Sequence, residues 1–324
     1  MSPCLYISQT FLPFEIELSG FNSEQLELVA KNSSLAVSRR SLGKPLAGRI
    51  FLEVDGDPAF QEQLAGLTTA QPSVLSGAEG VVVSSPGGQV LLPWSGSEVK
   101  ARVPASGGAE FYFVFETALF RILAEQGSMS LHAALVSING RNLLLVGKGG
   151  SGKSTLTLLL MQAGAKVLSD DSVLLSLQSG EFEVWGIRPF MVLREPALRV
   201  IDEDLMGQVI PFTVLGECKY RLSLGSELSC TASGIDAMLL LDGFVEQPES
   251  VLNAAHAGQV YARLVSQSSA LYFTDAFRAE QKALQPVITR LIETVPTHLL
   301  QPGGALMDSE NCQLELERLL AKVL

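Results

Sequence analysis

Hydrophobic and polar positions alternate along the first third of the chain. The clearest examples are Phe14–Leu18 and Arg49–Val54, and this period of two is typical of strands with one buried face. Two apolar runs flank the turn residues Ser84–Gly88 and predict a β-hairpin. Glu98–Val103 predicts one more strand. We therefore expect a small β-rich N-terminal domain over residues 1–105.

The period changes after the turn-rich segment Pro104–Gly108, which we take as a domain boundary. Residues 110–126 carry apolar side chains at helical spacing and are followed by Gly127, so they predict a helix. Further along, predicted strands and helices alternate, which is typical of an α/β domain and is expected here over residues 106–324. The predicted strands are 131–138, 141–146, 165–168, 173–177, 219–222, 237–241 and 296–300, and the predicted helices are 154–163, 196–204, 254–265, 274–294 and 311–324.

One segment of the second domain joins a hairpin to a loop. Asn139-Gly140 connects the strands 131–138 and 141–146 and is the strongest two-residue hairpin signal. The second strand leads into Gly147–Thr155, which reads G-x-x-x-x-G-K-S and opens an apolar helix. Strand, loop and helix form the context that a phosphate-binding loop requires. A doubly wound sheet would supply a parallel strand here, so the antiparallel hairpin predicts a different, mixed sheet.

The residue types of this loop suit a bound triphosphate. Glycines let the backbone turn tightly and aim N–H groups at one anion, and the start of the helix adds the positive end of its dipole. Lys153 can reach the β- and γ-phosphate oxygens, and the Ser154 hydroxyl can hold Mg²⁺. The sequence therefore predicts ATP and Mg²⁺ as ligands; a glycine-rich turn without a ligand is the alternative. The expected nucleotide-binding residues are Gly147, Lys148, Gly149, Gly150, Ser151, Gly152, Lys153, Ser154 and Thr155.

Two adjacent carboxylates, Asp170 and Asp171, follow the first strand after the loop's helix. One of them can hold Mg²⁺, and the other can accept a proton from an attacking hydroxyl. Because the two groups lie beside each other and a metal, their pKa values should separate, which suits two different roles. A solvated Asp-Asp turn between two strands is the alternative, and the spacing from the loop favours a site.

The charge of the chain limits the kinds of partner that we expect. The net charge of −11 and the pI of about 4.9 argue against a nucleic acid bound through a basic face, whereas a basic peptide or protein is compatible with them. No run approaches the ~18 apolar residues of a membrane span. The start of the chain lacks the basic and apolar regions of an export signal. The scattered cysteines favour free thiols in a reducing cytoplasm, where we expect the protein. These cysteines are Cys4, Cys218, Cys230 and Cys312.

The stretch from Leu131 through the loop to Asp171 resembles the HPr kinase/phosphorylase family and its looser bacterial relatives. Those proteins share a histidine that opens the first hairpin strand, a glycine turn, the loop, a glycine after the helix and an Asp-Asp pair. The resemblance is strong over about residues 110–178 and does not cover residues 1–105. It implies the fold of the phosphoenolpyruvate carboxykinase-like kinases, a mixed sheet in which a β-hairpin enters the P-loop.

The resemblance also implies roles for single residues. Asp170 would take the proton from a serine-type hydroxyl, and Asp171 would serve the metal or orient its water. His132 would lie close to the phosphates, although a core histidine is the alternative from the residues alone. Glu183 stands in a stretch that loosely matches the family's Glu-Ile-Arg-Gly. The implied catalytic residues are Asp170, His132 and Lys153, and the implied metal residues are Ser154, Asp171 and Glu183.

Arg188 and Arg194 lie just beyond this stretch, and either of them could pair with a phosphate or simply with a surface acid. Thr155 stands where the true HPr enzymes carry Glu, and the segment after the Asp-Asp pair does not reproduce their signature. We therefore do not expect HPr as the substrate.

The resemblance implies an ATP-dependent serine kinase that transfers the γ-phosphoryl group to a protein or precursor peptide, since relatives with this looser pattern often accompany peptide-modification systems. Relatives often assemble, so a homo-oligomer is a further expectation. A nucleotide-gated binding module without phosphotransfer and a small-molecule kinase are the alternatives.

Overall fold

The computed structural model describes residues 5–8, 14–35, 37–38, 41–65, 67, 73–105, 111–214, 217–224, 231–268, 278–308 and 310–324. The chain divides into two compact units, one of residues 1–126 with 275–280 and one of residues 127–274 with 281–324. Each unit is described by itself below.

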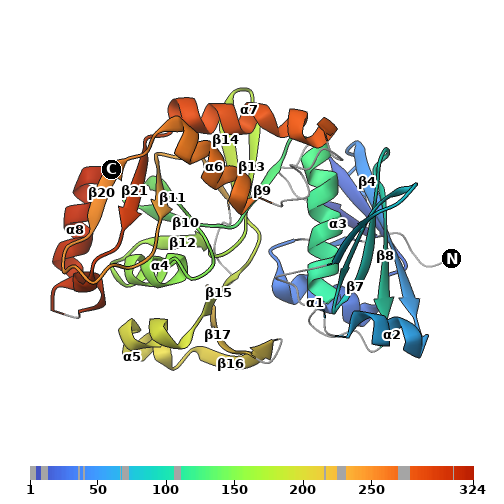
Figure 1. Cartoon of the computed structure of the whole chain (residues 1–324), viewed down its shortest axis with the longest axis horizontal. Coiled ribbons are helices and arrows are strands. Elements are labelled where there is room, and N and C mark those ends of the chain that lie inside the picture. Colours follow the sequence, from blue (N-terminus) through green and yellow to red (C-terminus); the bar gives the residue numbers. More distant parts are fainter. Residues whose placement is uncertain are drawn as a thin grey trace. The chain divides into compact units, whose positions relative to one another are not determined.

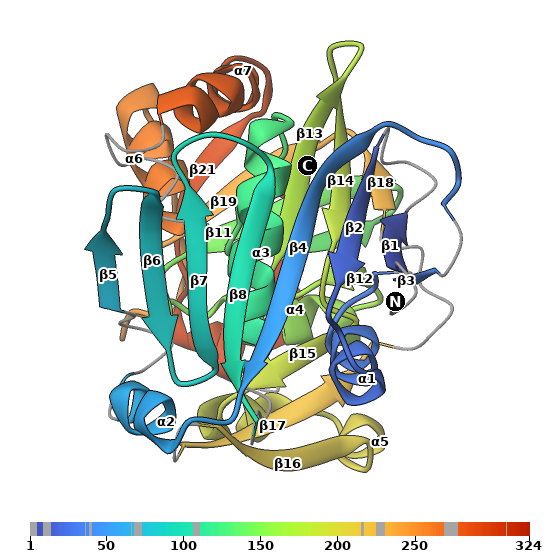
Figure 2. The ribbon, with the colours of Figure 1, turned by 90° about the vertical axis from the view of Figure 1, so that its right-hand side faces the viewer.

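One eight-stranded sheet forms the base of the first unit (Figure 2). The strands β2, β4 and β8 are mutually parallel, and the other neighbours pair antiparallel. The hairpin predicted around Ser84–Gly88 is confirmed as β6 and β7. Across the sheet the order is β3 (Val37–Ser38), β1 (Leu5–Ser8), β2 (Glu15–Ser19), β4 (Leu46–Asp55), β8 (Glu98–Pro104), β7 (Gly88–Pro93), β6 (Gly80–Ser85) and β5 (Ser73–Ser76).

Three helices accompany this sheet. The predicted helix is confirmed as α3 (Phe111–Glu125), which packs against β4, β7 and β8. The helices α1 (Ser23–Asn32) and α2 (Pro58–Leu64) were not expected from the apolar pattern, because each is short; capping at Asn22 and Asp57 sets their first turns. Because α3 packs on this sheet, it lies in the first unit. The expected division at residue 105 falls before α3 and stays a prediction, and residues 106–108 of the expected boundary lie outside the described residues.

A six-stranded mixed sheet is the centre of the second unit. The predicted hairpin is confirmed, with Asn139-Gly140 joining β10 to β11, and β11, β19 and β21 run parallel. The strand that feeds the loop is therefore antiparallel to one neighbour and parallel to the other. The order is β12 (Lys166–Ser169), β10 (Ala133–Ile138), β11 (Arg141–Gly147), β19 (Ala237–Leu241), β21 (Thr297–Gln301) and β20 (Val251–Ala254).

Two smaller antiparallel sheets complete the second unit. Four of their strands, over residues 181–186, 190–193, 209–214 and 231–233, were not predicted. The first sheet has the order β18 (Thr231–Ser233), β14 (Glu181–Gly186), β13 (Val173–Gln178) and β9 (Met129–Leu131). The second has the order β15 (Phe190–Leu193), β17 (Glu217–Ser223) and β16 (Val209–Val214).

Helix α4 (Lys153–Gln162) lies between the central sheet and the three-stranded sheet (Figure 1). Leu156 and Leu160 belong to the core of the central sheet. Leu158 packs instead with Met191 and Leu222 of the three-stranded sheet. A helix with two buried faces needs apolar residues nearly all round, which explains the unbroken apolar run after the loop.

The remaining helices largely follow the prediction. Helix α6 (Ala257–Gln267) begins after the predicted start, since residues 251–254 pair with β21 as a strand. Helix α7 (Arg278–Thr294) covers most of the predicted 274–294, of which 274–277 lie outside the described residues. Helix α8 (Cys312–Val323) closes the chain.

The prediction of a single helix over 196–204 is wrong, because the backbone is extended at Ile201 and Asp202. This extended stretch separates a 3₁₀ turn, η1 (Glu195–Val200), from the short helix α5 (Glu203–Met206). A further 3₁₀ turn, η4 (Gly304–Met307), precedes α8.

Within the described residues, no helix combines the length and the hydropathy needed to cross a membrane. Cys218 and Cys312 carry free thiols, whereas Cys4 and Cys230 lie outside the described residues.

Candidate active site

The loop between β11 and α4 takes a shape that depends on its glycines. Gly150 and Gly152 adopt φ values of +81° and +92°, a left-handed region that side chains disfavour. Gly152 caps α4 without any side-chain hydrogen bond. A Cβ atom built there would lie 2.4 Å from the Phe244 ring. The first turn of α4 thus keeps its N–H groups available to an anion.

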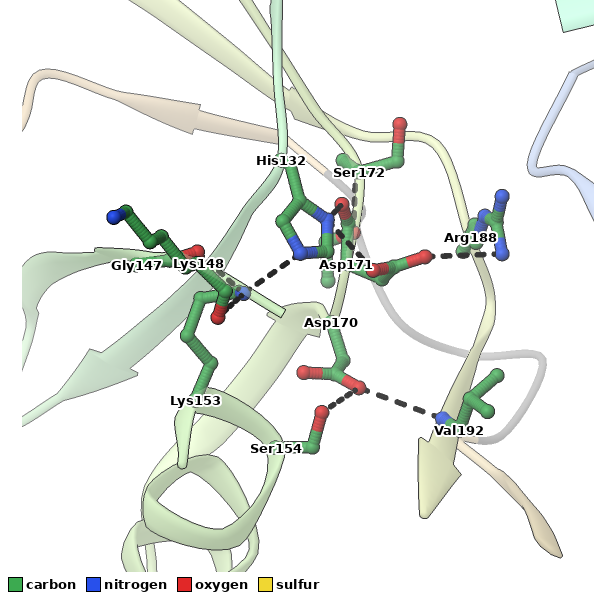
Figure 3. Close-up of polar contacts among 11 residues, drawn as sticks. His132, Gly147, Lys148, Lys153, Ser154, Asp170, Asp171, Ser172, Arg188 and Val192 are labelled. Atoms are coloured by element: carbon green, nitrogen blue, oxygen red, sulfur yellow. Dashed lines mark hydrogen bonds and ion pairs between the residues drawn. The ribbon is translucent and has the colours of Figure 1, made fainter. Parts of the chain in front are cut away.

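Lys153 is the first residue of α4 and is almost fully buried. Its side chain points toward His132 (Figure 3). Its Nζ atom donates to the carbonyl oxygen of Gly147 at 2.7 Å and lies 2.8 Å from Nε2 of His132. Burial lowers the Lys153 pKa, and the charge of Arg263 adds to this, while Asp171 and Asp170 oppose it. The ammonium is therefore held at the base of the loop by acceptors that a phosphate could replace.

His132 connects Lys153 to Asp171. It lies between β9 and β10, and its Nδ1 atom is 2.8 Å from Oδ1 of Asp171 and 3.1 Å from the carbonyl oxygen of the same residue. An ammonium can only donate hydrogen bonds, so Nε2 of His132 accepts and Nδ1 carries the proton that goes to Asp171. The histidine predicted to lie close to the loop is thus hydrogen-bonded to the loop's lysine.

The Asp171 carboxylate lies between two side chains that donate hydrogen bonds to it, those of His132 and Arg188. Arg188 reaches its Oδ2 atom at 3.1 Å from the side opposite His132 (Figure 3). Burial raises the Asp171 pKa, but Arg188, His132 and Lys153 outweigh it and hold this pKa well below its usual range. Its φ of +84° is uncommon for a residue with a side chain. Asp171 is therefore an ionised carboxylate with a fixed orientation.

Asp170 has the opposite environment and is completely buried. Its Oδ2 atom accepts from the Ser154 hydroxyl at 2.9 Å and from the Val192 amide at 3.4 Å. Its Oδ1 atom has no hydrogen-bond partner in the described part of the chain. Burial and the neighbouring Asp171 raise the Asp170 pKa to about 6, while hydrogen bonds from Ser154 and Val192 and the charge of Lys153 oppose the rise. The two carboxylates thus differ in pKa in the way the sequence predicts.

The oxygen atoms around Ser154 fit a magnesium ion. Mg²⁺ takes oxygen ligands and is held in many nucleotide sites by one or two protein oxygens together with phosphates and water. The Ser154 hydroxyl and the Asp170 carboxylate lie together, and the latter has a buried oxygen without a partner. In the described ranges no three His, Cys, Asp or Glu residues form a metal cluster. Most ligands of a metal here would therefore come from phosphate and water.

Three other residues named from the sequence, Glu183, Arg188 and Arg194, differ in how they relate to this site. Glu183 pairs with Ser176 across β14 and β13, three residue pairs from the end at Gly186. At about 3.3 Å per residue this is about 10 Å along the strand from Gly186, and among the described residues no hydrogen bond or ion pair joins Glu183 to Asp170 or Ser154. Its assignment to the metal stays a prediction without support from its position. Arg188 contacts the site through Asp171, whereas the side chain of Arg194 is exposed.

Three residues near the loop were not identified from the sequence: Asp242, Phe244 and Arg263. Leu241 pairs with Gly147, so Asp242 follows directly beside the loop. Arg263 donates from Nη1 to the Leu241 carbonyl oxygen at 3.0 Å and forms an ion pair with Asp242. Phe244 contacts the loop at Gly152. The only sequence signal was an apolar strand ending in Asp242 beside a possible loop strand; nothing local indicated Arg263 on α6.

Comparisons with known proteins bear on this arrangement. No family model matches the chain. It is 38% identical over 63 residues to HPr kinase/phosphorylase of Mycoplasmopsis pulmonis (strain UAB CTIP). The chain is a distant relative of HPr kinase/phosphorylase. The match covers 19% of this chain and 20% of that protein, so the similarity to HPr kinase/phosphorylase is partial.

Among solved structures, the Hpr(Ser) kinase/phosphatase from Coxiella burnetii matches with a TM-score of 0.27 and 14% identity. That match covers 60% of this chain and 92% of the Coxiella chain. The mixed α/β fold described above rests on the chain's own strand pairing, and the expected phosphoenolpyruvate carboxykinase-like fold stays a prediction.

Proposed function

We propose that this chain is an ATP-dependent kinase that transfers the γ-phosphoryl group to the hydroxyl of a serine in a protein or precursor peptide. The observation that carries the proposal is the contact set of Lys153 and Ser154. One end of α4 presents a buried ammonium next to His132 and a hydroxyl on Asp170. The distant relationship to HPr kinase/phosphorylase supports the same chemistry.

In this proposal the loop binds the phosphates. Backbone N–H groups at the start of α4 face the anion, and Lys153 exchanges its Gly147 and His132 acceptors for phosphate oxygens. The buried Ser151 hydroxyl has no partner among the described residues and is available to the same phosphates. Ser154 would hold Mg²⁺, and Asp171 would bind the ion directly or orient its water. When bound, the ion would supply positive charge that stabilises the negative charge of the phosphates.

Transfer breaks the bond between the γ-phosphorus and the oxygen that joins it to the β-phosphate. A new bond forms between the serine oxygen and the phosphorus, and ADP leaves. The serine proton goes to a carboxylate, for which we propose Asp170, because a pKa of about 6 suits a group that takes up a proton near neutral pH. Asp171 is the alternative base, since its side chain is 31% exposed whereas Asp170 is fully buried.

The experiment measures phosphate transfer from γ-labelled ATP with Mg²⁺ to a lysate of the source cell. Lys153→Ala and Asp170→Asn are run beside the wild type. Lys166→Ala and Asp204→Asn are matched controls, since both residues are exposed. We expect a labelled protein or peptide that disappears with Lys153→Ala and Asp170→Asn and persists in both controls.

Other results would select the alternatives. Label in small molecules alone would indicate a metabolite kinase. Tight ATP binding without any labelled product would contradict phosphotransfer and favour a nucleotide-gated binding module. Full activity of Asp170→Asn together with loss of activity in Asp171→Asn would show that Asp171 is the base.

A further inference from the structure

A cationic side chain outside the glycine-rich loop lies beside its first residue. Gly147 and Leu241 are paired in the parallel ladder of β11 and β19. The Leu241 carbonyl oxygen lies so close that a Cβ atom on Gly147 would be 3.0 Å from it. Arg263 donates to that same oxygen at 3.0 Å. The guanidinium of Arg263 is thus anchored next to the residue whose carbonyl holds Lys153.

Arg263 is a largely buried cation that lies near Lys153. Its side chain is 14% exposed and its charge reaches the buried Lys153, so two cations share one small region. Like charges held together cost free energy unless an anion lies between or beside them. The protein supplies one such anion, Asp242, whose side chain is 38% exposed at the end of β19.

The hydrogen bonds of Arg263 leave donors unused. A guanidinium has five N–H donors in a fixed fork. In the described part of the chain it donates one hydrogen bond to Leu241 and one to Asp242. The remaining donors are suited to a bidentate contact with a phosphate.

We propose that Arg263 is a phosphate-binding residue of the nucleotide site, and that Asp242 holds it in place beside the loop until the nucleotide binds. The inference rests on the proposed function, because it needs a polyphosphate at the loop. It adds a cation that comes from α6, about 110 residues after the loop in the sequence. Arg263 neutralises part of the phosphate charge without leaving the Leu241 oxygen.

The alternative is that Arg263 only fixes the end of β19. The two readings predict opposite effects for the two partners of the ion pair. If Arg263 binds phosphate, Asp242→Asn takes a negative charge away from the site while its amide oxygen can still accept a hydrogen bond from Arg263, so ATP binding is unchanged or tighter. If the ion pair is only structural, losing either partner weakens ATP binding equally.

The experiment is an equilibrium titration of the full chain with Mg-ATP, using a fluorescent ATP analogue as the displaced probe. The variants are Arg263→Ala, Arg263→Gln, which keeps a donor for the Leu241 oxygen without the charge, Arg263→Lys and Asp242→Asn. Arg199→Ala, at an exposed arginine of η1, is the matched control. Thermal unfolding of each metal-free, nucleotide-free variant reports whether it is folded.

We expect Arg263→Ala and Arg263→Gln to weaken ATP binding by about tenfold to hundredfold, the usual range for a hydrogen bond to a charged group. We expect Arg263→Lys to recover part of the loss and Asp242→Asn to bind at least as tightly as the wild type. Unchanged binding in a folded Arg263→Gln protein, or equal losses in Arg263→Gln and Asp242→Asn, would overturn the inference. Absence of ATP binding by the wild type would instead refute the proposed function.

Discussion

The Nζ atom of Lys153 lies 2.8 Å from Nε2 of His132. This contact is the first in a row of polar contacts, because Nδ1 of His132 contacts Asp171 and Asp171 contacts Arg188. Four side chains from four separate segments are thereby fixed around the start of α4. The orientation of Lys153 depends on a histidine that precedes it by 21 residues.

Replacing His132 tests whether this row of polar contacts matters for phosphate transfer. We expect His132→Ala to lower kcat/KM for ATP by about tenfold or more, because Lys153 loses an acceptor and Asp171 loses a donor at charged groups. His132→Gln should retain part of the activity, since its amide can both donate and accept. The measurement is steady-state label transfer, with His298→Gln on β21 as the control. Wild-type kcat/KM in His132→Ala would show that the contact does not matter to transfer.

The buried Asp170 predicts a pH-dependent stability. Its folded pKa of about 6 lies above the ordinary value of 3.8, so the folded state holds this proton more tightly than the unfolded state. Stability therefore falls as pH rises from about 4 to about 6, by about 3 kcal/mol when the difference in pKa is fully expressed. Asp170→Asn cannot ionise and should remove this loss.

Chemical denaturation of the metal-free wild type and Asp170→Asn at pH 4 and pH 7.5 checks the sign. The variant should be more stable than the wild type at pH 7.5, and this advantage should shrink at pH 4. Asp171 acts in the opposite direction in both proteins, since its lowered pKa stabilises the fold at neutral pH, so the comparison removes most of its contribution. A variant advantage that is constant with pH would exclude ionisation of Asp170 as its cause.

Gly152 gives a steric test of the loop. We expect Gly152→Ala to destabilise the fold by at least about 1 kcal/mol, because its φ of +92° disfavours a side chain and a Cβ atom would overlap the Phe244 ring. Gly149→Ala is the matched change for stability, since no atom lies within 4 Å of its Cβ position. The melting temperatures of the two variants should differ by about 2–4 °C or more. Equal melting temperatures would show that the loop relaxes around the new methyl group.

Ligand-dependent stability tests the nucleotide and the metal together. At a concentration of 100 times its Kd, Mg-ATP should stabilise the wild type by about 2.7 kcal/mol. Lys153→Ala should lose most of this gain, and excess EDTA should reduce it in the wild type, because Ser154 would contact the phosphates through the metal in our proposal. Calorimetry or dye-monitored unfolding measures the shift. A shift that survives EDTA unchanged would argue against a metal at Ser154.

Local sequence patterns predicted the elements whose conformation is set by their own residues. Asn139-Gly140 predicted its hairpin because few other residue pairs adopt two successive positive φ values, and both residues do so here. The Gly147–Thr155 segment predicted a strand-loop-helix, and the apolar run behind it predicted α4. These features depend on neighbouring residues only, so a single sequence can show them.

The short helices α1 and α2, the split of the segment 195–206 and most strands of the smaller sheets were not predicted. The two helices are short and depend on their caps, and the strands depend on pairing with segments far apart in the chain. Val192 illustrates this, since its amide contacts Asp170 only because the three-stranded sheet packs on α4.

The sequence by itself determined that Lys153, Ser154, Asp170 and Asp171 are present at a spacing that suits phosphoryl transfer. Only the tertiary structure decided that Ser154 contacts Asp170 while His132 and Arg188 hold Asp171. It also decided that Glu183 lies on β14 three residue pairs from Gly186 and that Arg263 arrives beside Gly147. The physical reason is that side-chain contacts and burial set pKa values and hydrogen-bond partners, and both arise from segments far apart in the chain.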